Sequence, residues 1–121
     1  MRRFPQLSPA AVEAYDLLAL PVWLFSVETL QILASNRAAQ TWLGYKAQVL
    51  HSMTIADVRP KAERGLIAQK VRQFDGSATD AGVWTIIAKS GEHYKASFYW
   101  QKVLFDGTEA ILASIRDISQ L

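Results

Sequence analysis

Alternation between apolar and polar positions is clearest near the end of the chain. Residues 109–119 follow the two-residue period of a β-strand. One side of this segment is wholly apolar and carries Ile111, Ala113 and Ile115, while the other side is only partly polar. Apolar side chains on both sides favour a strand in the middle of a sheet over a strand at its edge. The pattern therefore predicts a central last strand.

Four earlier segments have the same kind of pattern, and the sequence predicts strands over residues 22–27, 30–35, 83–88 and 94–104. Short links rich in turn-forming residues join neighbouring strands. Asp106-Gly107, which suits a two-residue hairpin turn, stands just before the last strand. The first two strands and the last three are therefore expected to form antiparallel hairpins.

Helical spacing replaces the strand period in three other parts of the chain. Ser8-Pro9 predicts the start of an amphipathic helix over 8–19. An asparagine cap and a terminal glycine predict a short helix over 37–43. A longer helix begins after Pro60, and its buried stripe is expected to consist of Glu63, Leu66, Ile67, Val71 and Phe74.

The order of these elements indicates the fold class. Two strands are followed by a helix, by one or two short helical turns within 46–58, by the long helix and by three strands. This order predicts an α+β domain with a five-stranded antiparallel sheet and its helices on one face. The N-terminal amphipathic helix needs an apolar surface of its own to lie on.

Length and composition fit a single globular domain. The chain has 121 residues, of which 50% are hydrophobic and 20% charged, so it can bury a core. A net charge of +2 without a basic stripe argues against nucleic acid as a partner. The longest apolar run, Leu17 to Phe25, is too short to span a bilayer, so no membrane contact by this domain is expected. The absence of cysteine excludes disulfides and fits a cytoplasmic location.

Several short motifs stand in a characteristic order along the chain. They are Pro21 before the first strand, Asn36-Arg-Ala-Ala39, Gly44-Tyr45, Met53-Thr-Ile-Ala-Asp-Val-Arg-Pro60, Trp84, Lys89-Ser-Gly91, Phe105-Asp-Gly107 and Asp117-Ile-Ser119. Together they resemble a PAS domain, and the resemblance covers residues 17–119.

The resemblance implies a fold and a role. With the five strands numbered along the chain, their spatial order would be 2-1-5-4-3, which places the last strand in the centre. The chain would be one sensor domain, residues 1–121, with an N-terminal helix at 8–19 and a PAS core at 21–119, cut from a longer bacterial signalling protein. The downstream output domain would be a histidine kinase of a two-component system, a diguanylate cyclase or phosphodiesterase, or a transcription regulator. In PAS domains the N-terminal helix commonly contributes to dimers, so a homodimer is expected here. The alternative is a monomer in which residues 8–19 cover their own sheet.

Three serines depart from the residues usual in PAS domains. Ser26 stands where an acid is common, Ser90 where aspartate is frequent, and Ser119 where threonine is usual. Ser119 keeps the hydroxyl, so the closing motif is expected to be intact. Because Ser26 replaces the usual acid, the sequence leaves open whether the end of the first strand makes a polar contact.

The residues argue against redox and catalytic chemistry. The flavin photoadduct of some PAS domains needs a cysteine, which this chain lacks. The haem-binding branch takes its axial ligand from a histidine on the long helix, and residues 61–74 contain none. His51 and His93 lie far apart in the sequence and fit solvated loop residues better than a metal site or a catalytic triad. We therefore expect no enzymatic activity in this domain, any catalysis belonging to the downstream output domain.

Ligand binding stays open, in the space between the apolar sheet face and the long helix. A pocket there would be lined by Leu66, Ile67, Val71, Trp84, Ile86, Phe98, Trp100, Ile111 and Ile115. These side chains offer few polar groups, so the ligand would be a small apolar or aromatic molecule, non-covalent flavin included. The alternative is that the bulky aromatics fill the space as ordinary core.

Lys89, Asp117 and Ser119 are the candidate signal-coupling residues. By resemblance to PAS domains, Asp117 anchors the exit from the last strand through polar contacts, and Lys89 ends a neighbouring strand and is the expected partner. The alternative is a screened surface pair worth less than about 1 kcal/mol.

Two other functions compete with a ligand sensor. A PAS domain can serve only as a ligand-free dimerisation or docking surface. A small enzyme or carrier of similar shape would need convergent polar groups in the pocket, and the residues expected to face inward include none.

Overall fold

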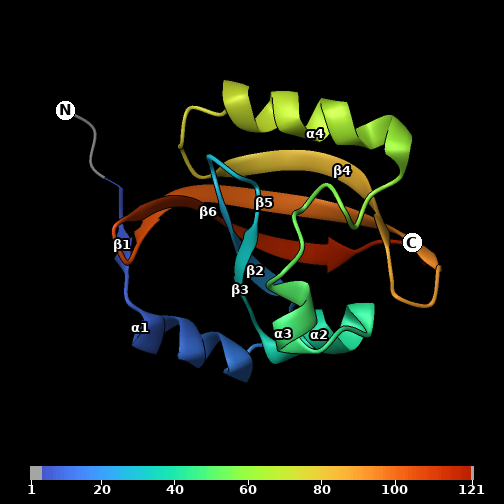
Figure 1. Cartoon of the computed structure of the whole chain (residues 1–121), viewed down its shortest axis with the longest axis horizontal. Coiled ribbons are helices and arrows are strands. Elements are labelled where there is room, and N and C mark those ends of the chain that lie inside the picture. Colours follow the sequence, from blue (N-terminus) through green and yellow to red (C-terminus); the bar gives the residue numbers. More distant parts are fainter. Residues whose placement is uncertain (1–3, 121) are drawn as a thin grey trace.

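The computed structural model describes residues 4–120, so residues 1–3 and 121 of the predicted domain lie outside the described residues. The strands are β1 (Gln6–Leu7), β2 (Val22–Ser26), β3 (Ile32–Ser35), β4 (Thr79–Ile87), β5 (His93–Phe105) and β6 (Thr108–Asp117) (Figure 1). The helices are α1 (Pro9–Glu13), the 3-10 helix η1 (Ala14–Leu17), α2 (Arg37–Leu43), α3 (Ala47–Leu50) and α4 (Lys61–Gln73).

The last strand lies in the middle of the sheet. β6 pairs antiparallel with β2 on one side and with β5 on the other. The order β3-β2-β6-β5-β4 confirms the predicted order of the five strands. Apolar residues on both faces of β6 agree with this position, because central strands are more often covered on both faces than edge strands are.

A sixth strand corrects the prediction of a purely antiparallel sheet. β1 pairs parallel with β5 through Gln6↔Leu104 and Leu7↔Phe105. β4 uses the same edge of β5 nearer its start, where Thr79 pairs with Trp100. β5 is thus long enough to hold two partners along one edge. β1 has only two residues, too few for an alternating pattern to reveal it.

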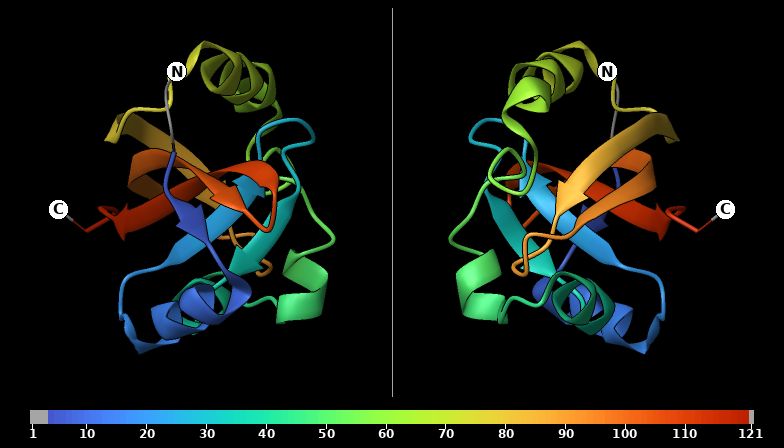
Figure 2. Two further views of the ribbon diagram at one scale, coloured as in Figure 1. Left: turned by 90° about the vertical axis from the view of Figure 1, so that its left-hand side faces the viewer. Right: turned by 90° about the vertical axis from the view of Figure 1, so that its right-hand side faces the viewer.

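Apolar side chains cover both faces of the sheet. The larger cluster includes Leu43 of α2, Leu50 of α3, and Ile67 and Val71 of α4. The smaller cluster lies on the opposite face, where Val12 of α1 packs against buried residues of β2, β5 and β6. The prediction that the helices lie on one face is therefore confirmed for α2 to α4. Figure 2 shows α4 above the curled sheet, away from the other helices.

The predicted caps and turns are confirmed. Asn36 caps α2, its Oδ1 accepting the N–H of Ala39 at 3.0 Å. Gly44 ends α2 with φ of +80°, a conformation that side-chain-bearing residues rarely adopt. Asp106 and Gly107 also have positive φ, as the turn between β5 and β6 requires.

Four predicted boundaries are wrong by two residues or more. The strand expected over 30–35 begins at Ile32, and the strand expected over 109–119 ends at Asp117. The helix expected over 8–19 ends at Leu17 and changes to 3-10 geometry after Glu13. Leu18, within the expected range, is 46% exposed. The strand expected over 83–88 begins earlier, at Thr79. Gly82, at φ of +95°, adjoins an irregularity in the β4–β5 register, so a polar segment that resembles a loop continues the strand.

No helix within residues 4–120 is both long enough and apolar enough to cross a membrane.

Candidate functional site

The interior between α4 and the sheet holds most of the predicted pocket residues. Trp84 is half-buried and packs against the larger cluster. Seven others are at most 4% exposed, namely Ile67, Val71, Ile86, Phe98, Trp100, Ile111 and Ile115. Leu66 is 57% exposed, so its predicted place in the buried stripe is wrong. Ile67 and Val71, four residues apart, define the buried side of α4, and Leu66 lies about 100° away around the helix.

Aromatic rings contact one another throughout this interior. The ring centroids of Trp23 and Phe98 lie 6.3 Å apart. Trp100 meets Phe25 at 5.6 Å and Phe74 at 5.5 Å, both edge to face. These distances are those of favourable aromatic pairs. The interior is therefore walled by aromatic side chains from β2, β5 and the end of α4.

One charged side chain enters this apolar interior. Arg59, two residues before α4, is 1% exposed. Its Cζ lies 5.1 Å from the ring centroid of Phe98 and 5.6 Å from that of Trp84. Burial lowers the pKa of Arg59 to about 10, and the charge of Glu63 opposes this shift. The guanidinium therefore stays protonated at neutral pH.

Unpartnered donors share this interior. Within residues 4–120, the buried side-chain nitrogen and oxygen atoms that lack a hydrogen-bond partner are Nε and Nη1 of Arg59, Nε1 of Trp23 and Nε1 of Trp100. All are N–H donors. Buried polar groups in folded proteins are nearly always hydrogen-bonded. The interior beneath α4 therefore presents donors and lacks acceptors.

The end of β6 forms a second polar centre. The Asp117 carboxylate accepts the indole N–H of Trp42 at Oδ2 (3.1 Å) and the backbone N–H of Ser119 at Oδ1 (2.9 Å). The Trp42 ring in turn stacks on Tyr94, with centroids 5.4 Å apart. Burial opposes the change, but the hydrogen bonds from Ser119 and Trp42 outweigh it and lower the pKa of Asp117.

The predicted partner of Asp117 needs correction. Trp42 of α2, not Lys89, holds the carboxylate. Within residues 4–120 the ion pair closer than 4 Å joins Lys102 and Glu109, so Lys89 does not pair with Asp117. The backbone N–H of Lys89 donates to the carbonyl of Leu43. Sequence reasoning missed Trp42 because an indole N–H is a neutral donor and only the fold brings it to β6.

The serines of the PAS-like motifs make local contacts. Ser119 Oγ accepts the backbone N–H of Lys95 at 2.8 Å, so the end of β6 is tied to β5. Ser26 is buried and accepts the N–H of Thr29 at 3.1 Å, which gives the end of β2 a polar contact within its own turn. Ser90 accepts the N–H of Glu92 in the turn between β4 and β5.

The histidines lie apart. His93 is exposed at the start of β5. His51 is half-buried, its Nε2 lying 2.8 Å from Ser35 Oγ, so its description as a solvated loop residue is wrong. Burial lowers the pKa of His51. Within residues 4–120, no three acidic or histidine side chains are placed to hold a metal ion.

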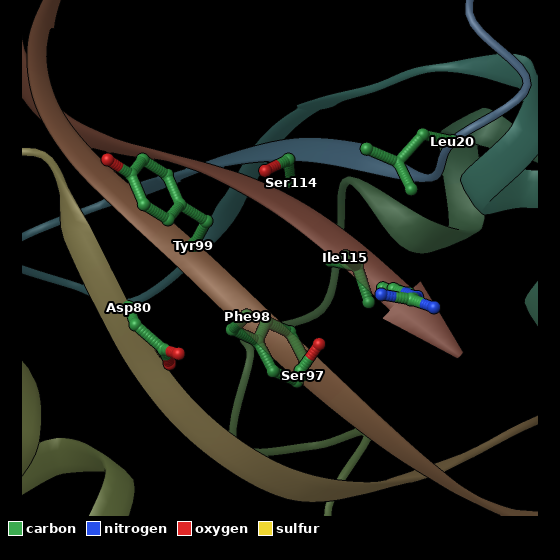
Figure 3. A pocket seen from close by; sticks show the side chains of 8 residues that line it. Leu20, Asp80, Ser97, Phe98, Tyr99, Ser114 and Ile115 are labelled. Carbon is green, nitrogen blue, oxygen red and sulfur yellow. The ribbon is translucent and has the colours of Figure 1, made fainter. Parts of the chain in front are cut away.

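The opposite face of the sheet carries a shallow hollow. A pocket of about 250 Å³ lies here. Figure 3 shows some of its lining residues, Asp80 of β4, Ser97 and Tyr99 of β5, Ser114 of β6 and Leu20. Tyr99 is 50% exposed. This face is an apolar and polar mixture, as the alternation along the strands predicts.

Arg59 is the residue that sequence reasoning missed at the interior site. The sequence shows only an arginine between Val58 and Pro60, in the link that leads into α4. Arginine in such a link is ordinarily solvated. Only the fold brings its guanidinium close to the rings of Trp84 and Phe98.

Comparison with known proteins gives a fold. No protein-family model matches the sequence, and a search of curated proteins returns no match. Solved PAS domains do match in structure. One from Desulfitobacterium hafniense superposes with a TM-score of 0.76 at 18% identity, over 85% of this chain and 96% of that one.

Two further matches come from signalling proteins. A domain of a sensory box sensor histidine kinase/response regulator from Geobacter sulfurreducens has a TM-score of 0.74 at 17% identity, over 89% of this chain and 92% of that one. The PAS domain of the Cronobacter turicensis quorum-sensing receptor RpfR, in complex with BDSF, has a TM-score of 0.69 at 17% identity, over 84% and 95%. These likenesses establish the PAS fold.

Proposed function

We propose, from the PAS fold of this chain, that it is a sensory domain that binds a small molecule beneath α4 and signals through β6 to a downstream output domain. Sensor kinases and a quorum-sensing receptor among its structural matches support a signalling role. The output domain would be one of the classes that accompany PAS modules. The sensory domain itself would be non-catalytic, and its role would be binding.

The observation that carries this proposal is the course of β6. Its inward side chains Ile111 and Ile115 are fully buried beneath α4. Two residues after Ile115, the strand delivers Asp117 to Trp42 of α2. A molecule that changed the packing around Ile115 would therefore act on the Asp117 contact through a rigid, fully paired strand.

Coupling through Asp117 can be tested in the full-length protein. We expect Asp117→Ala to abolish the effect of ligand on output. The domain should stay folded, because the hydrogen bonds that this change removes lie at its exposed edge. Arg116→Ala is the matched control, since Arg116 is exposed and adjacent. Output activity, with and without stimulus, and circular dichroism provide the readout. A normal response in Asp117→Ala would remove Asp117 from the mechanism.

A second candidate function is a ligand-free docking module, which the exposed apolar residues favour. Leu17 is 88% exposed, and Leu18 and Leu20 beside it are 46% and 41% exposed. Leu18 and Leu20 line the same hollow as Tyr99 on the open sheet face. This surface could bind a second copy of the chain, as the predicted homodimer would need.

Sedimentation and native mass spectrometry separate the two functions. A docking module would associate with rising concentration and carry no small molecule. Leu17→Glu would then shift the association to higher protein concentration. A ligand sensor would bind a small molecule whether or not it associates.

A further inference from the structure

The position of Arg59 is fixed by its backbone. Its N–H bonds the carbonyl of Ala56 at 3.2 Å, and its own carbonyl accepts Nε of Arg64 at 3.3 Å. Pro60, the next residue, fixes the entry into α4. The side chain leaves this anchored link toward the sheet and is 1% exposed. Arg59 thus reaches the interior as part of the fold and not as a surface residue folded inward.

The charge of Arg59 has no direct counter-ion. Glu63 is close enough to favour the charged form, yet its Oε1 accepts the backbone N–H of Thr85 at 2.9 Å. Within residues 4–120 the ion pair closer than 4 Å lies elsewhere, between Lys102 and Glu109. A buried charge without a partner destabilises a fold. Arginine is almost never fully buried unless it is paired.

The rings around Arg59 stabilise its charge but not its hydrogen bonds. The guanidinium lies within 6 Å of the ring centroids of both Trp84 and Phe98, the range of a cation–π contact. Ring faces accept a cation, but Nε and Nη1 still lack acceptors. Trp23, whose ring neighbours Phe98, also has an unpartnered Nε1. The site therefore lacks acceptor oxygens for these N–H groups and a negative charge to balance the guanidinium.

We infer that the interior beneath α4 binds a small aromatic monocarboxylate, with its carboxylate on the Arg59 guanidinium and its ring among Trp23, Trp84 and Phe98. This inference rests on the proposed sensory function and names its ligand class. A carboxylate matches a guanidinium in shape and charge. One cation neutralises a monoanion, so a phosphate dianion fits less well. The aromatic walls select a flat, apolar body.

Entry of the ligand is explained by the loose attachment of α4. Over its thirteen residues, the buried side chains are Ile67 and Val71. Glu63 adds one hydrogen bond from α4 to Thr85 of β4. The Phe74–Trp100 ring pair and the bond from Arg64 to the Arg59 carbonyl hold its two ends. An outward movement of the middle of α4 would admit a small ring without breaking the sheet.

The test compares acids with their amides. Benzoate, phenylacetate and 3-phenylpropanoate are each titrated by calorimetry into the purified chain, alongside benzamide, phenylacetamide and 3-phenylpropanamide. We expect at least one acid to bind, with its amide at least tenfold weaker. Arg59→Met should remove this preference for the acid, whereas Arg72→Met, on the exposed side of α4, should keep it. Because Arg59→Met removes an unpaired buried charge, we expect its thermal midpoint to equal or exceed that of the wild type.

Three results would overturn the inference. They are binding of none of the three acids, equal affinity for acid and amide, and undiminished acid binding by Arg59→Met. The acid and amide comparison needs only the wild-type chain, so it decides the matter even if a variant does not fold. Binding of amides alone would reject the anionic ligand and leave the sensory function standing. Failure of Asp117→Ala to alter output would reject the signalling path without touching the ligand class.

Discussion

Asn36 joins three parts of the molecule through one side chain. Its Oδ1 accepts the N–H groups of Val22 and Ala39, and its Nδ2 donates to the carbonyls of Tyr15 and Leu20. It is 3% exposed. The asparagine therefore caps α2 and also fixes the N-terminal segment to β2. A cap alone would need only the bond to Ala39.

We expect Asn36→Ala to lower the free energy of unfolding by about 3 kcal/mol, the sum of a lost cap and buried groups left unpaired. Asn36→Ser keeps a side-chain oxygen that can cap Ala39 and loses the two donated bonds, so its stability should fall between those of Asn36→Ala and the wild type. Urea denaturation measures both. A loss below about 0.5 kcal/mol for Asn36→Ala would contradict this role.

His51 gives the domain a pH dependence of known sign. Burial lowers its pKa, so the unfolded chain binds the proton more readily than the folded one. Its contribution to stability is therefore present above about pH 6.5 and is lost as the pH falls through the folded-state pKa. We expect stability to fall between pH 7.5 and 5.0 more steeply in the wild type than in His51→Gln. Equal slopes in thermal unfolding would contradict the burial of His51.

At the scale of elements, α4 depends on one narrow apolar stripe. Ile67 is fully buried and its neighbour Leu66 is 57% exposed. We expect Ile67→Ala to cost about 3 kcal/mol of stability through the cavity it leaves, and Leu66→Ala to cost less than about 0.5 kcal/mol. Denaturation of the two variants side by side gives the comparison. Similar losses at both positions would mean that α4 is rotated from the orientation described.

The elements show where sequence reasoning succeeds. The strands, α2 and its caps were predictable because alternation, an asparagine and a glycine act locally. The central place of β6 followed from apolar residues on both of its sides. β1 was not predictable, because a two-residue parallel pairing depends on β5 having a free length of edge. The sequence pattern wrongly predicts Leu66 in the buried stripe, because an apolar side chain alone does not show which side of a helix it occupies.

The candidate site was predictable only in part. The apolar wall followed from strand periodicity, and seven of its nine residues are at most 4% exposed. Arg59 and the contact between Trp42 and Asp117 were not predictable. In both cases the fold brings together residues whose spacing in the sequence gives no signal. Trp42 and Asp117, for example, are 75 positions apart.

At the scale of the whole molecule, the sheet separates two surfaces of different chemical character. The interior beneath α4 contains donors without acceptors, and the opposite face carries exposed apolar residues suited to another protein chain. β6 belongs to both, since its alternate residues face each side. A ligand on one side could therefore change an interface on the other, or the Asp117 contact at the end of the strand, without any change of fold.

The four tryptophans offer a direct test of this coupling. Trp23 and Trp84 lie at the proposed ligand site, Trp100 packs against Phe25 and Phe74, and Trp42 reports on Asp117. Their indole N–H signals can be followed by ¹⁵N NMR and assigned by single Trp→Phe variants during titration with phenylacetate. The account predicts that the Trp42 signal shifts in step with those of Trp23 and Trp84. A Trp42 signal that stays in place while those two reach saturation would contradict it.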